Sequence, residues 1–437
     1  MDPFNRPQKP VSWMKYQRDA FKSGTQEGHF PPFSTDASKL ESLAHEKLSQ
    51  NGWLYASSNA GLGTTHSANM NAFKNWKIVP KMLQPNHERD TRIELFEKTL
   101  SAPIAFAPIG INKIYHHLGE LPVAKVAGEL GLPYTLSTAG SVPIEDAAKS
   151  NILGAQEGYK ESLGAQYGDG LRYYQLYMPH DWELGANLLQ RAVDSGYEAC
   201  IFTVDTWSLG WRHEDVATSN YAFYKGIAAD LGLSDKVFMK RIREQGIDSN
   251  DLQTIGERWV DSYWHGVPWS WDDLPKIIKL WKDISGGKPF GVKGIQRAED
   301  AERCIKAGCE IIWVTNHAGR QIDGAIASLD ALPSIAEKVN GRAKIIFDSG
   351  VRSGSDIFKA ICLGADVVAL GRQWIWGLSI QGEVGVRHVM KAILAEFDIV
   401  MMLAGVKNIQ EIKENGQELL KYMPNGVDLA LAAKAKI

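Results

Sequence analysis

Short apolar runs that end in polar residues or glycine recur along most of this chain, and stretches typical of amphipathic helices lie between most of them. Eight strands covered on both faces, alternating with helices, are typical of an α/β protein with a (β/α)8 TIM barrel. An open doubly wound sheet is the alternative, but it does not require eight strands in one unbroken alternation. The apolar runs cover residues 103–110, 133–138, 172–177, 200–205, 289–294, 311–317, 344–350 and 367–372, and the helical stretches cover 118–130, 182–195, 297–307, 329–339 and 353–363.

The chain has 437 residues, whereas a bare barrel needs about 250. We expect the barrel over residues 101–400, an N-terminal extension over 1–100 and a helical tail over 401–437. Within the extension, residues 1–35 predict an irregular surface arm. Ser38 and Glu41 form a capping-box pattern that opens a helix to about Gln50, and small residues over 52–63 favour turns.

A long insertion separates the fourth and fifth predicted strands. It covers residues 207–288, whereas such connections usually have 2–6 residues. Seven of the chain's 14 tryptophans fall within it, so it is not a disordered linker. Because the C-terminal face of a barrel carries the chemistry, a long loop there favours a lid. A contact between copies in a homo-oligomer is the alternative.

Composition excludes several classes of function. The net charge of −3 gives no reason to expect binding to nucleic acid or an anionic membrane, and no apolar stretch approaches the roughly 20 residues of a membrane span. Four cysteines without CxxC spacing predict a reducing compartment and no metal site. We therefore expect a cytoplasmic protein. The ending Ala435-Lys436-Ile437 is a variant of a peroxisomal signal, so peroxisomal delivery is the alternative.

The sixth apolar run leads directly into His317 and Arg320. A histidine can accept a proton near neutral pH, and an arginine offers a rigid fork of donors for a carboxylate or phosphate. Taken alone, the two residues could equally be a surface histidine and a solvated arginine without a function. At a strand end it predicts a base beside an anion clamp, with Asp205 orienting the histidine and Arg212 as a second cation.

The last two predicted strands end in glycines beside arginines, namely Gly350 with Arg352 and Gly371 with Arg372. Backbone N–H groups and guanidinium groups at this end of a barrel are typical of a phosphate site. Elsewhere at the strand ends, Gln175 and Thr203 suit the edge of a heterocycle, and Lys293 suits a developing anion. Together these residues predict a phosphorylated cofactor and a small acid substrate.

The chain resembles the FMN-dependent α-hydroxy acid oxidases, which include glycolate oxidase and lactate oxidase. The resemblance runs from about residue 40 to 420, and within the family it is strongest to the lactate 2-monooxygenases. The motifs that carry it are Q-L-Y at 175–177, T-V-D-T-W-S-L-G-W-R at 203–212, V-K-G-I at 292–295, N-H-A-G-R-Q at 316–321, D-S-G-V-R-S-G at 348–354 and L-G-R at 370–372.

The resemblance implies FMN as cofactor, a short L-2-hydroxy acid (L-lactate first) and O2 as substrates, and a homo-oligomer. His317 would take the substrate's hydroxyl proton as hydride passes to flavin N5, with Asp205 supporting it. The residues implied in substrate binding are Tyr55, Gly110, Tyr177, Arg212 and Arg320, with Tyr177 and Arg320 also catalytic. Those implied in cofactor binding are Pro108, Ile109, Gly110, Ser137, Gln175, Thr203, Lys293, Thr315, Asp348, Gly350, Arg352, Gly371 and Arg372.

Four positions depart from the family pattern without removing a catalytic group. Ala318 replaces the glycine that usually follows the catalytic histidine, and Gln373 stands where proline commonly follows G-R. Met70 replaces an arginine, and Ala139 replaces a bulky aromatic residue of the pocket wall. The expected products are acetate, carbon dioxide and water. The alternatives are a plain oxidase that releases the 2-keto acid and hydrogen peroxide, and a dehydrogenase that uses another electron acceptor.

Overall fold

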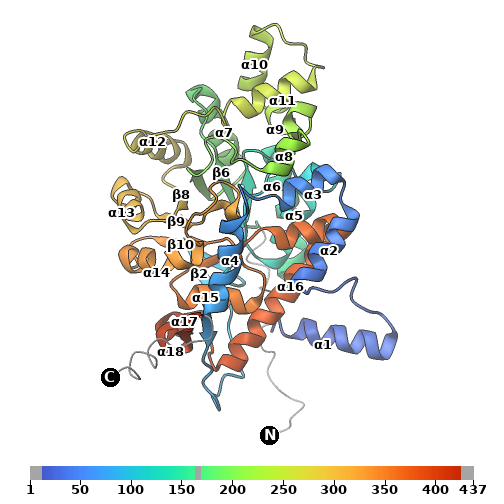
Figure 1. Cartoon of the computed structure of the whole chain (residues 1–437), viewed down its shortest axis with the longest axis vertical. Helices are drawn as coiled ribbons and strands as arrows, with labels where there is room; N and C mark the ends of the chain where they lie inside the picture. The colour runs from blue at the N-terminus through green and yellow to red at the C-terminus, as the bar shows by residue number, and fades with distance from the viewer. Residues whose placement is uncertain (1–11, 163–168, 425–437) are drawn as a thin grey trace.

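A closed barrel of eight parallel strands forms the centre of the computed structural model, which describes residues 12–162 and 169–424 (Figure 1). The strands pair in chain order, and the last pairs with the first, as predicted. Seven of the strands are shorter than their apolar runs because the polar residues at their ends turn into the following loop, whereas the fifth, Phe290–Ile295, is as long as its run. The strands are β4 (Ile104–Phe106), β5 (Tyr134–Ser137), β6 (Arg172–Leu176), β7 (Ala199–Thr203), β8 (Phe290–Ile295), β9 (Ile311–Val314), β10 (Lys344–Phe347) and β11 (Val367–Leu370).

A helix follows each strand and covers the outside of the barrel. Three of them, α6, α12 and α16, are absent from the predicted helical stretches. α6 was hidden by Gly154 and Gly158, which usually interrupt helices but here let α6 pack closely on the helix before it. The barrel helices are α5 (Leu121–Leu130), α6 (Ile144–Ser162), α7 (Trp182–Asp194), α12 (Leu274–Ser285), α13 (Ala298–Ala307), α14 (Ser328–Val339), α15 (Gly354–Cys362) and α16 (Arg372–Ala404).

The N-terminal extension is more helical than predicted. The expected irregular arm contains α1 (Lys15–Lys22) and a π-helical turn over Ser23–Glu27. The predicted capping box is wrong in its cap residue. Asp36 caps α2 (Ala37–Lys47) by accepting from the backbone of residues 38 and 39, and the Ser38 hydroxyl donates to the same carboxylate. The turn-prone stretch begins as a helix, α3 (Gln50–Ser57), and is followed by α4 (Thr64–Asn75).

The segment between β7 and α12 folds into short helices, which Figure 1 shows gathered at one end of the molecule, far from α17 and α18. The expected boundary at residue 400 falls within α16, so the barrel and its tail share one helix. The last described strand, β12 (Leu420–Tyr422), pairs with β1 (Trp76–Ile78) of the extension. The remaining helices are α8 (His213–Ala217), α9 (Asp230–Leu233), α10 (Lys236–Glu244), α11 (Leu252–Asp261), α17 (Ile409–Glu414) and α18 (Gly416–Leu419).

Residues of the barrel strands point alternately inward and outward. Outward residues pack against the helices, whereas inward residues such as Tyr173, Ile201 and Trp313 form a separate apolar cluster inside the barrel. A hairpin of β2 (Ile93–Leu95) and β3 (Lys98–Leu100) adds Leu95 and Leu100 to this inner cluster. The hairpin therefore closes the N-terminal end of the barrel and leaves the C-terminal end for a site.

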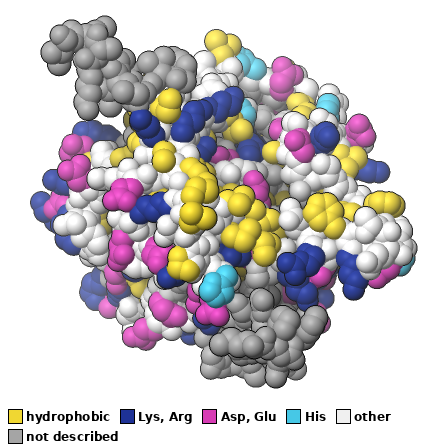
Figure 2. All heavy atoms as spheres, turned by 90° about the horizontal axis from the view of Figure 1, so that it is seen from below, with side chains coloured by type: hydrophobic (Ala, Val, Ile, Leu, Met, Phe, Trp, Pro, Cys, Tyr) yellow, Lys and Arg dark blue, Asp and Glu magenta, His cyan; other side chains and the backbone are white. Residues whose placement is uncertain are grey.

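Much of the outer surface is polar, although Figure 2 shows hydrophobic side chains gathered near the middle of the face seen from below. Among the described residues, no helix is both long and apolar enough to cross a membrane. The possible targeting tripeptide Ala435-Lys436-Ile437 lies outside the described residues.

The hairpin that closes the barrel suggests a test of the core. Leu95 is fully buried, and Leu95→Ala should lower the free energy of unfolding by about 2–5 kcal/mol, the usual cost of such a cavity. The midpoint of thermal unfolding measures the loss. Leu83→Ala is the control, because Leu83 is fully exposed and should leave the midpoint unchanged. Equal midpoints for the two variants would contradict a packed closure.

Candidate active site

The inner face of the barrel changes from apolar to polar at the C-terminal ends of the strands. Ser137, Gln175 and Thr203 are linked there, because the Ser137 hydroxyl donates to Gln175 Oε1 and Gln175 Nε2 donates to Thr203 Oγ1, both at 2.9 Å. On the opposite side of the barrel, Asp348 accepts from Trp313 Nε1 at 2.8 Å and from the Thr315 hydroxyl. This polar layer forms the floor of a cavity.

The cavity is open to solvent and has a volume of about 950 Å³. Most residues singled out from the sequence line it. Four of the predicted residues do not line the cavity, namely Gln175, Thr203, Thr315 and Asp205. Gln175, Thr315 and Asp205 are each hydrogen-bonded to a residue that lines it. Thr203 is hydrogen-bonded to Gln175. The predicted residues in the lining are Tyr55, Pro108, Ile109, Gly110, Ser137, Tyr177, Arg212, Lys293, His317, Arg320, Asp348, Gly350, Arg352, Gly371 and Arg372.

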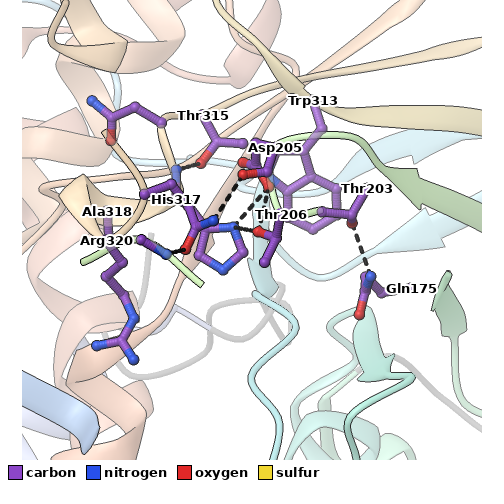
Figure 3. Close-up of polar contacts among 12 residues, drawn as sticks. Gln175, Thr203, Asp205, Thr206, Trp313, Thr315, His317, Ala318 and Arg320 are labelled. Carbon is purple, nitrogen blue, oxygen red and sulfur yellow. Dashed lines mark hydrogen bonds and ion pairs between the residues drawn. The ribbon is translucent and has the colours of Figure 1, made fainter. Parts of the chain in front are cut away.

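A hydrogen bond joins His317 and Asp205 at this cavity (Figure 3). His317 Nδ1 lies 2.8 Å from Asp205 Oδ1 and 3.2 Å from the Thr206 hydroxyl, which itself donates to Asp205 Oδ1. Burial tends to raise the pKa of the Asp205 carboxyl, but the charges of His317 and Lys293 outweigh burial and hold this pKa at about 2. Because Asp205 is ionised, His317 Nδ1 carries the shared proton, and Nε2 is left with its lone pair.

The imidazole of His317 is neutral at neutral pH. Burial lowers its pKa below the usual value, and the nearby charges of Lys293 and Arg212 lower it further, although Asp205 acts in the opposite sense. The backbone supports an unusual geometry here, since His317 and Ala318 both have φ of 57°, in the left-handed region. A glycine would adopt this conformation at lower cost, so Ala318 adds strain beside the histidine.

Two arginines that line the cavity, Arg212 and Arg320, lie next to each other. Arg212 is 3% exposed, and it donates to the Arg320 carbonyl at 3.2 Å and to Gln321 Oε1 at 3.1 Å. Arg320 Nη1 donates to the Ser58 carbonyl at 2.8 Å, and its guanidinium lies 5.2 Å from the centre of the Tyr55 ring. Burial and the charge of Arg320 lower the pKa of Arg212 to about 10, so it remains a cation.

Arg352 and Arg372 lie at the ends of the last two strands. Arg372 donates to the Ala56 carbonyl at 3.0 Å and to Asn59 Oδ1 at 2.8 Å, and Arg352 donates to a backbone carbonyl. Burial lowers the pKa of both groups. Gly350, two residues before Arg352, has φ of 88°, and a Cβ there would lie 2.7 Å from the Asn69 carbonyl oxygen. Only glycine lets the backbone pass between α4 and the cavity.

Five cations therefore surround one cavity without a direct ion pair. Across residues 12–162 and 169–424, none of them forms an ion pair with a carboxylate within 4 Å. Charges removed from water need a partner, so this arrangement calls for anionic ligands. The five are Arg212, Lys293, Arg320, Arg352 and Arg372.

Further residues line the cavity that were not among the candidate site residues. Tyr115 comes from the loop between β4 and α5, Ile375 comes from α16, and Leu209 and Trp264 come from the insertion. Trp264 also packs edge-on against Tyr177, with ring centres 5.4 Å apart. Thr206 and Ser349 could have been found, since each directly follows a predicted residue. The other added residues are Ala56, Ala107, Ala139, Ala318, Val351 and Ala369.

The fold and site define a barrel enzyme that binds a phosphorylated cofactor and a small acid, and the similar proteins identify its family. Residues 44–418 match the FMN-dependent dehydrogenases. The FMN-dependent alpha-hydroxy acid dehydrogenase qulF of Penicillium citrinum is 37% identical over 414 residues, covering 94% of this chain and 98% of that protein. The L-lactate oxidase of Lysinibacillus sphaericus is 35% identical over 382 residues, covering 87% and 92%.

The solved structure of a lactate oxidase from Pediococcus acidilactici matches with a TM-score of 0.73 at 32% identity, and covers 88% of this chain and 94% of that chain. A mandelate oxidase structure matches with a TM-score of 0.68 at 28% identity, covering 87% and 97%. The chain belongs to the FMN-dependent α-hydroxy acid oxidoreductases, and FMN is its cofactor.

The cavity fits FMN on its own chemistry. Arg352 and Arg372 beside the Gly350 turn suit a phosphate dianion. Lys293 is buried beside the polar floor, where it suits the electron-rich edge of a reduced heterocycle. Another wall is formed by Pro108, Ile109 and Gly110, where Gly110 packs closely against Ala139.

This wall suggests a test of cofactor binding. A Cβ at Gly110 would lie 2.6 Å from the Ala139 carbonyl oxygen, so Gly110→Ala should displace the loop and weaken FMN binding. Titration of apoprotein with FMN, followed by flavin fluorescence, measures the dissociation constant. Gly246→Ala is the control for backbone strain alone, since Gly246 has φ of 72° and a Cβ there meets nothing within 4 Å. Unchanged FMN affinity in Gly110→Ala would show that the loop does not shape this wall.

Proposed function

We propose that this FMN-dependent α-hydroxy acid oxidoreductase oxidises a short L-2-hydroxy acid, L-lactate first, with O2 as the electron acceptor. The observation that carries the proposal is the His317–Asp205 pair, which faces the same cavity as the uncompensated Arg212 and Arg320. The two cations suit the carboxylate of a 2-hydroxy acid, and the neutral base suits removal of the proton from its hydroxyl group. The L-lactate oxidase relatives support lactate as the first choice.

In this proposal the substrate carboxylate binds between Arg212 and Arg320, where it supplies the missing counter-ion. His317 Nε2 takes the hydroxyl proton, and Asp205 stabilises the imidazolium that results. Burial and the charge of Asp205 raise the pKa of Tyr177, which therefore stays protonated and can donate to the substrate oxygen. FMN, when bound, supplies the acceptor for the hydride.

Cofactor binding is assigned to residues around the floor and far side of the cavity. Gly350, Arg352, Gly371 and Arg372 would hold the phosphate, and Asp348 the ribityl chain. The residues that would surround the ring are Pro108, Ile109, Gly110, Ser137, Gln175, Thr203, Lys293 and Thr315.

Anaerobic reduction tests the function directly. The yellow holoprotein should bleach when L-lactate is added without oxygen, and D-lactate serves as the control. Readmitted O2 should restore the colour at a catalytically useful rate. If no short L-2-hydroxy acid bleaches the protein, the proposed function is wrong; if bleaching occurs but O2 reoxidises it slowly, a dehydrogenase with another acceptor is the better description.

The base can be tested by His317→Asn. The phosphate contacts and all of the assigned ring contacts except Thr315 come from other strands, so this variant should retain FMN. Its anaerobic reduction by L-lactate should be slower by roughly 10²–10⁴-fold, the usual contribution of a positioned base. Stopped-flow absorbance gives the rate. A variant that is reduced at nearly the parental rate would place the base elsewhere.

We propose further that the products are acetate, carbon dioxide and water. Pyruvate and hydrogen peroxide held together react as if at very high concentration, with loss of CO2, so the outcome depends on retention of the keto acid. Arg212 and Arg320 provide a cationic grip on its carboxylate. Leu209 and Trp264 bring the insertion to the cavity wall, where it can act as a lid that limits escape.

Product analysis under air, with catalase omitted, tests this outcome. The parent protein should form acetate and CO2 in equal amounts with little free peroxide. Trp264→Ala opens the wall that the insertion provides, and should increase the fraction released as pyruvate and peroxide. Stoichiometric pyruvate and peroxide from the parent's first turnovers would instead identify a plain oxidase.

A further inference from the structure

The turn that carries His317 is held through its backbone to an unusual degree. Four consecutive N–H groups, from residue 316 to residue 319, each donate to a side-chain oxygen. Two of these residues, His317 and Ala318, are not glycine yet have left-handed backbone angles, which persist only where surrounding contacts enforce them. The acceptors in chain order are Ser328 Oγ at 2.9 Å, Thr315 Oγ1 at 2.9 Å, Ser349 Oγ at 3.0 Å and Asn316 Oδ1 at 3.1 Å.

The side chain of Asn316 is itself fixed by Asn69 from α4. Asn69 Nδ2 donates to Asn316 Oδ1 at 2.8 Å, and Asn316 Nδ2 donates to Asn69 Oδ1 at 2.7 Å. Asn69 Oδ1 also accepts from Ser328 N at 3.0 Å. The two amides are 1% and 4% exposed, so their hydrogen bonds are shielded from water. A buried and satisfied polar pair of this kind specifies one arrangement of the groups attached to it.

Helix α4 is anchored to the segment that follows the turn. The Asp323 carboxylate accepts from the backbone N–H groups of Leu62, Thr64 and Thr65, at 2.8, 2.7 and 3.3 Å. The Thr65 hydroxyl donates to the Ile322 carbonyl at 2.8 Å. The start of α4 is therefore fixed relative to the loop that leads away from His317.

The same helix passes close to both glycines that shape the site. A Cβ at Gly319 would lie 2.7 Å from His66 N, and a Cβ at Gly350 would lie 2.7 Å from the Asn69 carbonyl oxygen. Asn69 thus contacts the His317 turn with its side chain and the turn beside Arg352 with its backbone. One helix of the N-terminal extension touches the segments assigned to proton transfer and to the phosphate.

We propose that Asn69 is a positioning residue for His317. Through Asn316 it fixes the turn so that His317 keeps its contact with Asp205 and directs Nε2 into the cavity. This inference rests on the proposed function, because it assumes that His317 is the base. It assigns a role in the reaction to a helix outside the barrel.

Holoenzyme carrying Asn69→Ala should retain FMN and be reduced by L-lactate about 10- to 100-fold more slowly, as expected when a catalytic group is displaced by a fraction of an ångström to 1 Å. A looser contact with Asp205 should also lower the apparent pKa of His317 in the pH profile of kcat/KM, because Asp205 is the group that raises this pKa against Lys293 and Arg212. Asn71→Ala is the matched control, because Asn71 is exposed on the same helix.

A cycle with Asn316→Ala identifies the path of the effect. If Asn69 acts through Asn316, the double variant should be little slower than either single variant, whereas independent losses that multiply would overturn the proposal. A parental reduction rate and pH profile in Asn69→Ala would also overturn it, even with lowered thermal stability, since the pair would then serve packing alone.

Should Asn69→Ala fail to fold, Ser328→Ala removes the acceptor of the Asn316 N–H group while keeping α4 intact. It should shift rate and pH profile in the same direction, and an unchanged profile would overturn the proposal. His317→Asn measured in parallel separates the two levels of inference. Slow reduction in His317→Asn with parental behaviour in Asn69→Ala rejects only the positioning role. Parental reduction in His317→Asn rejects His317 as the base and the positioning role with it, whereas a parent protein that no short L-2-hydroxy acid bleaches rejects the proposed function.

Discussion

The convergence of five cationic side chains on one cavity is the constraint on which the site depends. In the described part of the chain, none of the five forms a direct ion pair with a carboxylate, namely Arg212, Lys293, Arg320, Arg352 and Arg372. Packing and neutral acceptors must hold them in place until anionic ligands arrive, because like charges in a poorly solvated space destabilise the folded state. The same positive charges attract the carboxylate of an acid and a phosphate. The charges that destabilise the folded protein are therefore those that favour ligand binding.

Neutral acceptors for these cations come from the end of α3. The carbonyl groups of Ala56 and Ser58 each accept from both Arg320 and Arg372. Carbonyl groups in the last turn of a helix lack partners within the helix and carry partial negative charge, so they suit cations. The arginine assigned to the substrate and the arginine assigned to the phosphate therefore share one support. With α4 beside the His317 turn, the N-terminal extension completes the active site.

Local pattern was enough to predict the barrel, because its strands are continuous apolar runs and their polar ends meet at one face whatever the details of the helices. For the same reason, the pattern was enough to predict that His317, Arg320 and the glycine–arginine pairs lie at this face of the barrel. The cap of α2 was wrong because Asp36 and Ser38 both fit an N-terminal pattern, and only the backbone geometry decides between them. Asn69 and Trp264 could not be predicted, since each reaches the site through contacts between segments far apart in the chain.

Gly110 and Ala139 form one structural feature. A Cβ at Gly110 would lie 2.7 Å from the Ala139 Cβ and 2.6 Å from its carbonyl oxygen, so the two loops touch through their backbones. The buried Glu120 carboxylate holds them there by accepting from Asn112 N at 3.2 Å and Ser141 N at 2.8 Å. A larger residue at position 110 would force these loops apart. The shape of the cavity wall here is thus set by how closely the two loop backbones approach. This approach requires a small residue at both positions, because a larger side chain at either one would separate the loops.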